Sequence, residues 1–202
     1  SGQLWTATSA TASDFQAAGG AWNLIKQIDA SSSATINFVN GASSVVLDGT
    51  YQLYCIKIIQ AHVATDLAHF EMNFSDDTSS HSYDLNKTWS GTRQYNTDAD
   101  SPSFGINAQS SDGQSTDHVV ISNEMVNDND GSASGEVWIY NPANTAFATH
   151  FTASIVSFSQ ERVLGHEIVG YCDIPGAVTA VQFKGSSGNI DSGRFTLSGI
   201  TT

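Results

Sequence analysis

Paired carboxylates are the first residues that could do chemistry, since two of them flanking a glycosidic bond can cleave it. Glu161 with Glu167 and Asp128 with Asp130 are such pairs, but twenty Asp and Glu residues make close pairs common by chance. The six histidines lack H-E-x-x-H spacing, and neighbouring His166 and Glu167 would point to opposite faces of a strand. There is also no G-x-S-x-G elbow, P-loop or dinucleotide fingerprint. We therefore expect no enzymatic activity and no cofactor.

The segment 127–131, Asn-Asp-Asn-Asp-Gly, is the most ligand-like part of the sequence. Calcium binds clustered side-chain oxygens of this kind, which makes Asp128 and Asp130 the candidate calcium ligands. The segment does not match an EF-hand loop, because the Glu at the twelfth position is missing. We favour an Asn/Asp turn before a strand, without bound metal.

Three aromatic residues, Trp5, Trp89 and Tyr95, lie outside the clearest strand patterns. If their rings are exposed, they form a platform that can stack on sugars, and they are the candidate glycan-binding residues. The alternative, which we favour, is that these rings plug sheet edges or a subunit contact.

Composition excludes some classes of partner. Seven Lys and Arg against twenty Asp and Glu give a net charge of −13, which repels nucleic acid. No apolar stretch reaches the roughly 18 to 20 residues that span a bilayer, so we expect a soluble chain without membrane insertion. Cys55 and Cys172 both lie in apolar runs, which favours buried free thiols over a disulfide.

Alternation with period two dominates the chain and predicts strands. In residues 68–74, Phe70, Met72 and Phe74 share one face, while the residues between them are expected to meet water. Helical periodicity is weak, with one short candidate at 13–18. Further strands are predicted at 22–28, 35–39, 51–63, 118–122, 136–140, 147–158, 167–172, 178–184 and 194–200.

These short strands with little helix between them predict an all-β fold, an antiparallel β-sandwich of jelly-roll type. We expect one sandwich domain over 21–202, preceded by an arm or short helix at 1–20, with 98–117 as a long surface loop. Asn40-Gly41 predicts a hairpin between 35–39 and 45–47. The strand 51–63 is apolar on both faces, which indicates a central strand with a bulge or a strand packed on a neighbouring subunit.

Four segments, in this order along the chain, resemble a group of small virion proteins of marine tailed phages. They are Trp22-Asn-Leu-Ile-Lys26, Leu47-Asp-Gly-Thr-Tyr51, Glu136-Val-Trp-Ile-Tyr-Asn-Pro142 and the final block from Val181 to Ile200. The final block, a strand, a Ser/Gly/Asn loop and a strand ending in Gly-Ile, is the most specific. Together they cover residues 22–200.

The resemblance implies a structural component of the virion, either a capsid decoration or a tail-fibre-associated protein that is assembled in the host cytoplasm. Its partners would be other virion proteins and further copies of itself, with a trimer expected by analogy. The alternative is a receptor-recognition module of a tail fibre that binds host-surface glycan. A glycan hydrolase is the third reading.

Overall fold

The computed structural model describes residues 21–173 and 176–201. Within them the chain forms thirteen strands and one short 3-10 helix, η1 (Ala108–Ser110), and no helix is long and apolar enough to cross a membrane. The predicted arm at 1–20 and its helix at 13–18 lie outside the described residues. The strands are β1 (Trp22–Ser33), β2 (Ile36–Val39), β3 (Leu53–Val63), β4 (Ala68–Ser75), β5 (Lys87–Thr97), β6 (Ser103–Ile106), β7 (Asp112–Ser115), β8 (Val119–Met125), β9 (Ala133–Tyr140), β10 (Thr149–Ser159), β11 (Arg162–Cys172), β12 (Ala180–Gly185) and β13 (Ile190–Ile200).

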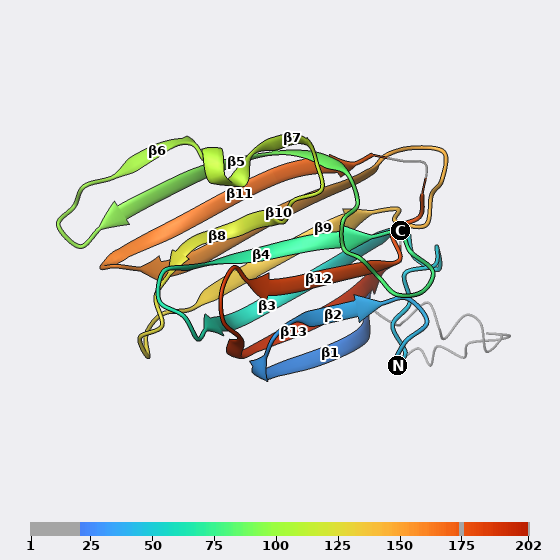
Figure 1. The fold of residues 1–202 in the computed structure, drawn as a ribbon, viewed down its shortest axis with the longest axis horizontal. Coiled ribbons are helices and arrows are strands. Elements are labelled where there is room, and N and C mark those ends of the chain that lie inside the picture. The colour runs from blue at the N-terminus through green and yellow to red at the C-terminus, as the bar shows by residue number, and fades with distance from the viewer. Residues whose placement is uncertain (1–20, 174–175, 202) are drawn as a thin grey trace, which may run out of the picture.

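Two antiparallel sheets pack face to face as a sandwich, as predicted. The nine-stranded sheet has the order β1-β13-β3-β9-β10-β11-β5-β6, with β7 also paired to β5, and the four-stranded sheet has the order β2-β12-β4-β8. The smaller sheet covers one face of the larger, with β2 over β1 and β8 over β10 and β11 (Figure 1). The uneven division differs from an eight-stranded jelly roll, so the jelly-roll type is not confirmed.

The core lies between the sheets. Phe70 of β4 and Phe183 of β12 stack with ring centroids 6.1 Å apart, and Phe195 of β13 contacts both rings. All three side chains are fully buried. Because Phe195 comes from the large sheet and the other two from the small one, this three-ring cluster joins the layers.

Alternation along β4 is confirmed on its inner face and wrong at one outer position. Phe70, Met72 and Phe74 are buried, as predicted, but so is Asn73. The Asn73 amide donates hydrogen bonds to the carbonyls of Tyr83 and Thr116. Two loops therefore cover this face, and Asn73 holds them in place.

Strand β3 has the two apolar faces that its sequence indicates. Tyr54, Cys55 and Ile56 are all fully buried, β13 and β9 flank the strand, and a register shift between Ile58 and Ala61 marks a bulge. A central strand with a bulge is confirmed. The thiols of Cys55 and Cys172 are free and buried, and burial raises the pKa of each to about 12.

Two predictions about connections are wrong. The segment 98–117 is not one long loop, because it contains β6, η1 and β7, which pair with or pack on β5. Residues 45–47 form no strand, and β2 pairs with β12 instead. Asn40 does make a turn there, because its side chain accepts a hydrogen bond from the Leu47 amide.

Candidate binding face

The candidate site is the face of the nine-stranded sheet that points away from the four-stranded sheet, which we call the outer face. Antiparallel pairing aligns its side chains in rows that cross the strands. The polar row consists of Thr92, Glu167, Ser154, Glu136, Lys57 and Thr196, each paired with the next. The intervening residues on these strands point inward and are mostly buried.

Exposed apolar side chains gather on the outer face. Among the described residues eleven large hydrophobic side chains are exposed, and only Leu67 and Phe147 lie elsewhere, both in loops. The register and burial pattern place the other nine on the outer face: Trp22, Leu24, Ile59, Phe104, Ile106, Tyr140, Val156, Val163 and Val169. Concentration on one face is typical of a binding surface, because scattered single side chains are the norm elsewhere.

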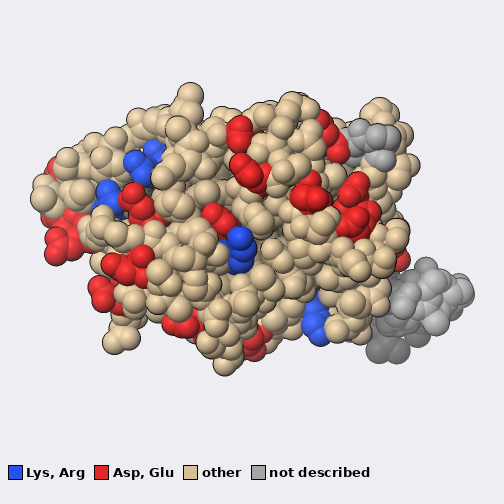
Figure 2. All heavy atoms as spheres, viewed as in Figure 1, with Lys and Arg blue, Asp and Glu red and all other residues tan. Residues whose placement is uncertain are grey.

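Acidic side chains, unlike the exposed apolar ones, are few on the outer face. On the visible face, which carries the four-stranded sheet, Asp and Glu are spread over the surface and outnumber Lys and Arg (Figure 2). On the strands of the outer face the acidic side chains are Asp29, Glu136 and Glu167, and Arg194 pairs with Asp29 at 2.7 Å. The outer face is therefore less acidic than the rest of the molecule, and Glu136, Glu167 and Lys57 lie together in its polar row.

One end of the outer face carries an aromatic patch, which we define as Trp22, Leu24, Trp138 and Tyr140. The rings of Trp22 and Trp138 meet edge to face with centroids 5.4 Å apart. The Lys57 ammonium lies 4.9 Å from the Trp22 ring centroid. Cys55, which pairs with Trp138 on the outer face, is fully buried. The patch is therefore an ordered cluster and not a set of separate exposed side chains.

Next to the patch lies a groove of about 970 Å³ that crosses β3, β9, β10, β11, β5 and β6. Its polar lining includes Glu136 and Glu167. One oxygen of each carboxylate accepts a hydrogen bond from a neighbouring side chain. Trp138 Nε1 donates to Glu136 Oε1 at 2.8 Å, and Ser154 Oγ donates to Glu167 Oε1 at 2.6 Å. The apolar lining includes the exposed ring of Phe104 on the edge strand β6. The groove therefore combines oriented acceptors with apolar surface.

Trp89 was predicted as a sugar platform or an edge plug, and a platform role is wrong. It lies on β5 and points between the sheets, where it is only 5% exposed. The ammonium of Lys87 lies 5.2 Å from its ring centroid and donates to the Leu85 carbonyl at 3.1 Å. Burial lowers the pKa of Lys87 to about 8. These residues belong to the core.

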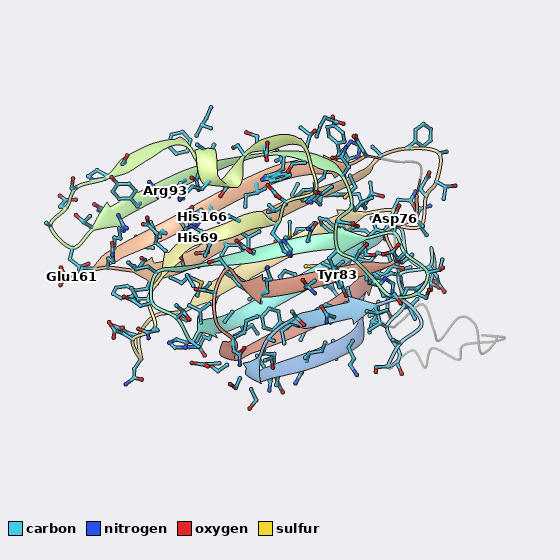
Figure 3. All side chains as sticks on the ribbon, viewed as in Figure 1. His69, Asp76, Tyr83, Arg93, Glu161 and His166 are labelled. Carbon is cyan, nitrogen blue, oxygen red and sulfur yellow. The ribbon has the colours of Figure 1, made fainter. Side chains whose placement is uncertain are left out.

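Tyr95 lies further along β5, near the end of the sandwich where Arg93 and Glu161 are seen in Figure 3. Its ring is half-buried between two cations, since the guanidinium groups of Arg93 and Arg162 lie 5.6 and 5.7 Å from the ring centroid. Arg162 also pairs with Glu124 at 2.9 Å. Tyr95 borders the groove, since it lies between Gln94 and Asn96 on β5. Its side chain has the same inward parity as Trp89, however, so neither ring is presented on the outer face.

The remaining predicted residues do not form a site with them. Trp5 lies outside the described residues. Asp128 and Asp130 lie in the turn between β8 and β9, where the Gly131 amide donates to the Asp128 carbonyl. They line a hollow of about 530 Å³ with Asp66 and Glu161. No three acidic, His or Cys side chains in the described ranges are close enough to hold a metal.

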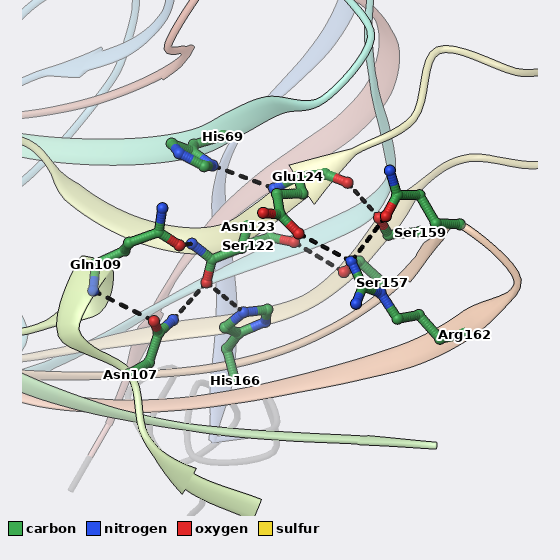
Figure 4. A network of polar contacts seen from close by, with 11 residues as sticks. His69, Asn107, Gln109, Ser122, Asn123, Glu124, Ser157, Ser159, Arg162 and His166 are labelled. Carbon is green, nitrogen blue, oxygen red and sulfur yellow. Dashed lines mark hydrogen bonds and ion pairs between the residues drawn. The ribbon is translucent and has the colours of Figure 1, made fainter. Parts of the chain in front are cut away.

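A buried polar network joins β8 to β10, β11 and η1 (Figure 4). His166 Nε2 donates to Asn123 Oδ1 at 2.9 Å, and Asn123 Nδ2 donates to Gln109 Oε1 at 2.6 Å. Asn107 also donates to Asn123 Oδ1. Nδ1 of His166 has no partner, and burial, with the nearby Arg93 charge, lowers the pKa of His166 to about 4. The network fixes a neutral histidine between the sheets.

The residues that matter most on the outer face were not predicted as a site. Trp138, Tyr140 and Glu136 share one parity of β9, opposite Val137 and Ile139. Aromatic side chains on the parity expected to face water were the available signal. Phe104 gave no such signal, because β6 was expected to be loop.

The sequence matches no protein-family model, and comparisons with curated proteins and with solved structures give no match. The resemblance to small virion proteins therefore stays a prediction.

Proposed function

We propose that the protein is a non-catalytic structural component of a tailed-phage virion, which attaches to neighbouring virion proteins through the aromatic patch. The observation that carries this proposal is the patch itself: ordered aromatic and aliphatic side chains left exposed on an otherwise acidic protein. Tryptophan and tyrosine are enriched among the residues that dominate binding energy in interfaces.

The patch also connects to the resemblance. Trp22 and Leu24 belong to the first segment that carries it, and Trp138 and Tyr140 belong to the third. The last strand of the final segment lies between their strands, since β13 pairs with both β1 and β3, and Ile200 pairs with Trp22. Parts of three of the four segments that resemble virion proteins thus contribute to one surface.

Attachment of several identical copies to a symmetric particle adds their individually weak contacts. Neighbours in the proposal include capsid or tail proteins and other copies of the chain. A trimer, assembly in the host cytoplasm and final location in the virion are parts of the same proposal.

The test is to add the purified chain back to virions assembled without it, and to measure binding by cosedimentation. Leu24 is 66% exposed, so Leu24→Arg leaves the fold intact while it places a charge in the patch. We expect apparent affinity for the virion to fall at least about tenfold, because burying an unpaired charge costs more than about 1.4 kcal/mol.

Leu67→Arg is the matched control, since Leu67 is also exposed but lies in the loop between β3 and β4. It should bind as the unaltered chain does. Equal binding by both variants, or no binding by the unaltered chain, would contradict the proposal.

A further inference from the structure

We infer that the groove on the outer face is a binding site for a neutral oligosaccharide. The structure assigns this site to a different part of the face from the aromatic patch, because four exposed apolar side chains line the groove without belonging to the patch: Ile59, Phe104, Val156 and Val163. The inference therefore goes beyond the proposed attachment.

The shape of the groove indicates an extended ligand. Its lining residues come from six neighbouring strands, so it crosses five interstrand spacings, or roughly 24 Å. Its volume of about 970 Å³ is at the upper end for small-molecule sites. A chain of linked units fits this length better than a single compact molecule.

The position of the groove argues against a peptide strand as occupant. Peptides that bind sheets add to a free edge, where main-chain groups are unpaired. On the face of the sheet the main-chain groups of β3, β9, β10, β11 and β5 are engaged with neighbouring strands. A ligand in the groove must therefore be recognised by side chains alone.

Those side chains match a polyol. Glu136 and Glu167 each offer a second carboxylate oxygen as acceptor, and Gln94 and Asn96 add amide groups. The 73% exposed ring of Phe104 stands at the β6 end, where it can cover the apolar C–H face of a pyranose. Alternating hydroxyl and C–H surface is what such a lining complements.

The charge of the groove selects a neutral chain. Two carboxylates face one ammonium, Lys57, within a protein of net charge −13. Sulfated or uronic-acid polymers would meet repulsion and too few cations. Nucleic acid is disfavoured for the same reason.

The test uses the full chain on an immobilised panel of neutral gluco-, xylo-, manno- and chito-oligosaccharides, with sulfated and polyuronic chains beside them. We expect binding to at least one neutral series and none to the anionic chains. The strongest binder is then titrated in solution by calorimetry, and the mixture is analysed for shortened products.

Two pairs of variants locate the site. Phe104→Ala and Glu167→Ala should each weaken binding at least about tenfold. Phe147→Ala and Glu161→Ala are their controls, since Phe147 is equally exposed at 73% and both controls lie in loops and do not line the groove. Leu24→Arg, which is expected to weaken attachment to the virion, should bind the oligosaccharide normally.

Binding that survives both groove variants would overturn the inference, as would binding to anionic chains only or to none of the panel. Shortened products would show a hydrolase instead of a binding site. Loss of glycan binding with normal attachment to the virion, or the reverse, separates failure of this inference from failure of the proposed function.

Discussion

Replacing Phe183 by alanine is expected to lower the free energy of unfolding by about 3 to 5 kcal/mol. The ring is fully buried and contacts Phe70 in its own sheet and Phe195 in the other. Truncation therefore removes buried apolar area and leaves a cavity where the sheets meet. Urea denaturation followed by tryptophan fluorescence at pH 7 measures the change.

Phe147→Ala is the control for this effect, because the Phe147 ring is exposed in the loop between β9 and β10. It should change stability by less than about 0.5 kcal/mol. If Phe183→Ala does not fold, the milder Phe183→Leu still reports the contact between sheets. A loss below about 1 kcal/mol for Phe183→Ala would show that the three-ring cluster does not join the layers.

Acidification from pH 6.5 to pH 4 is expected to destabilise the protein through His166. The pKa of this buried imidazole is lowered from 6.5 to about 4. In that window the unfolded chain binds a proton that the folded chain does not, so stability falls as pH falls, by up to about 1.4 kcal/mol per pH unit. Integrated over the window, the loss is on the order of 3 kcal/mol.

His166→Gln should remove most of this dependence, since a glutamine amide can donate to Asn123 Oδ1 without gaining a charge. His150→Gln, at an exposed position of β10, should leave the dependence intact. Burial also lowers the pKa of His118, so a smaller slope is expected to remain in His166→Gln. Denaturation curves across this pH range give the comparison. An unchanged slope would place the acid sensitivity elsewhere.

The sequence predicted those strands in which an apolar series marks the face that packs in the core. Alternation along β4 and β10 follows directly from burial between two layers. It failed for β5, where polar residues such as Thr92, Gln94 and Asn96 face outward and no regular apolar series marks the inner face. Pairing with β11 along its whole length stabilises β5. This contact is tertiary, so the local sequence pattern does not reveal the strand.

Turn chemistry was predictable only where it used typical residues. Asn40 and Gly41 do make a turn. The tight connection between β10 and β11 was not visible, because Gln160 and Glu161 adopt positive φ angles of 48° and 57° without glycine or asparagine. Antiparallel pairing of two long strands holds these residues in a conformation that their types do not favour.

The candidate site was the least predictable part. A strand pattern shows that one parity faces outward, but it does not show which strands are neighbours. Trp22 and Trp138 are far apart in the sequence, and β13 and β3 lie between their strands in the sheet. Their rings meet across these two strands, which only the strand order could show. Trp89, which looked free of strand patterns, lies on β5, the strand that was not predicted, and is buried on its inner face.

We propose that the outer face is the binding surface of the protein and that its aromatic patch makes the attachment. Cryo-electron microscopy of the intact virion tests it most directly, because it shows which face of each copy meets a neighbour. We predict that Trp22, Leu24, Trp138 and Tyr140 are buried against a neighbouring virion protein while the groove near β6 stays open to solvent. Copies attached through the four-stranded sheet, with the aromatic patch in solvent, or virions that lack the chain, would contradict the account.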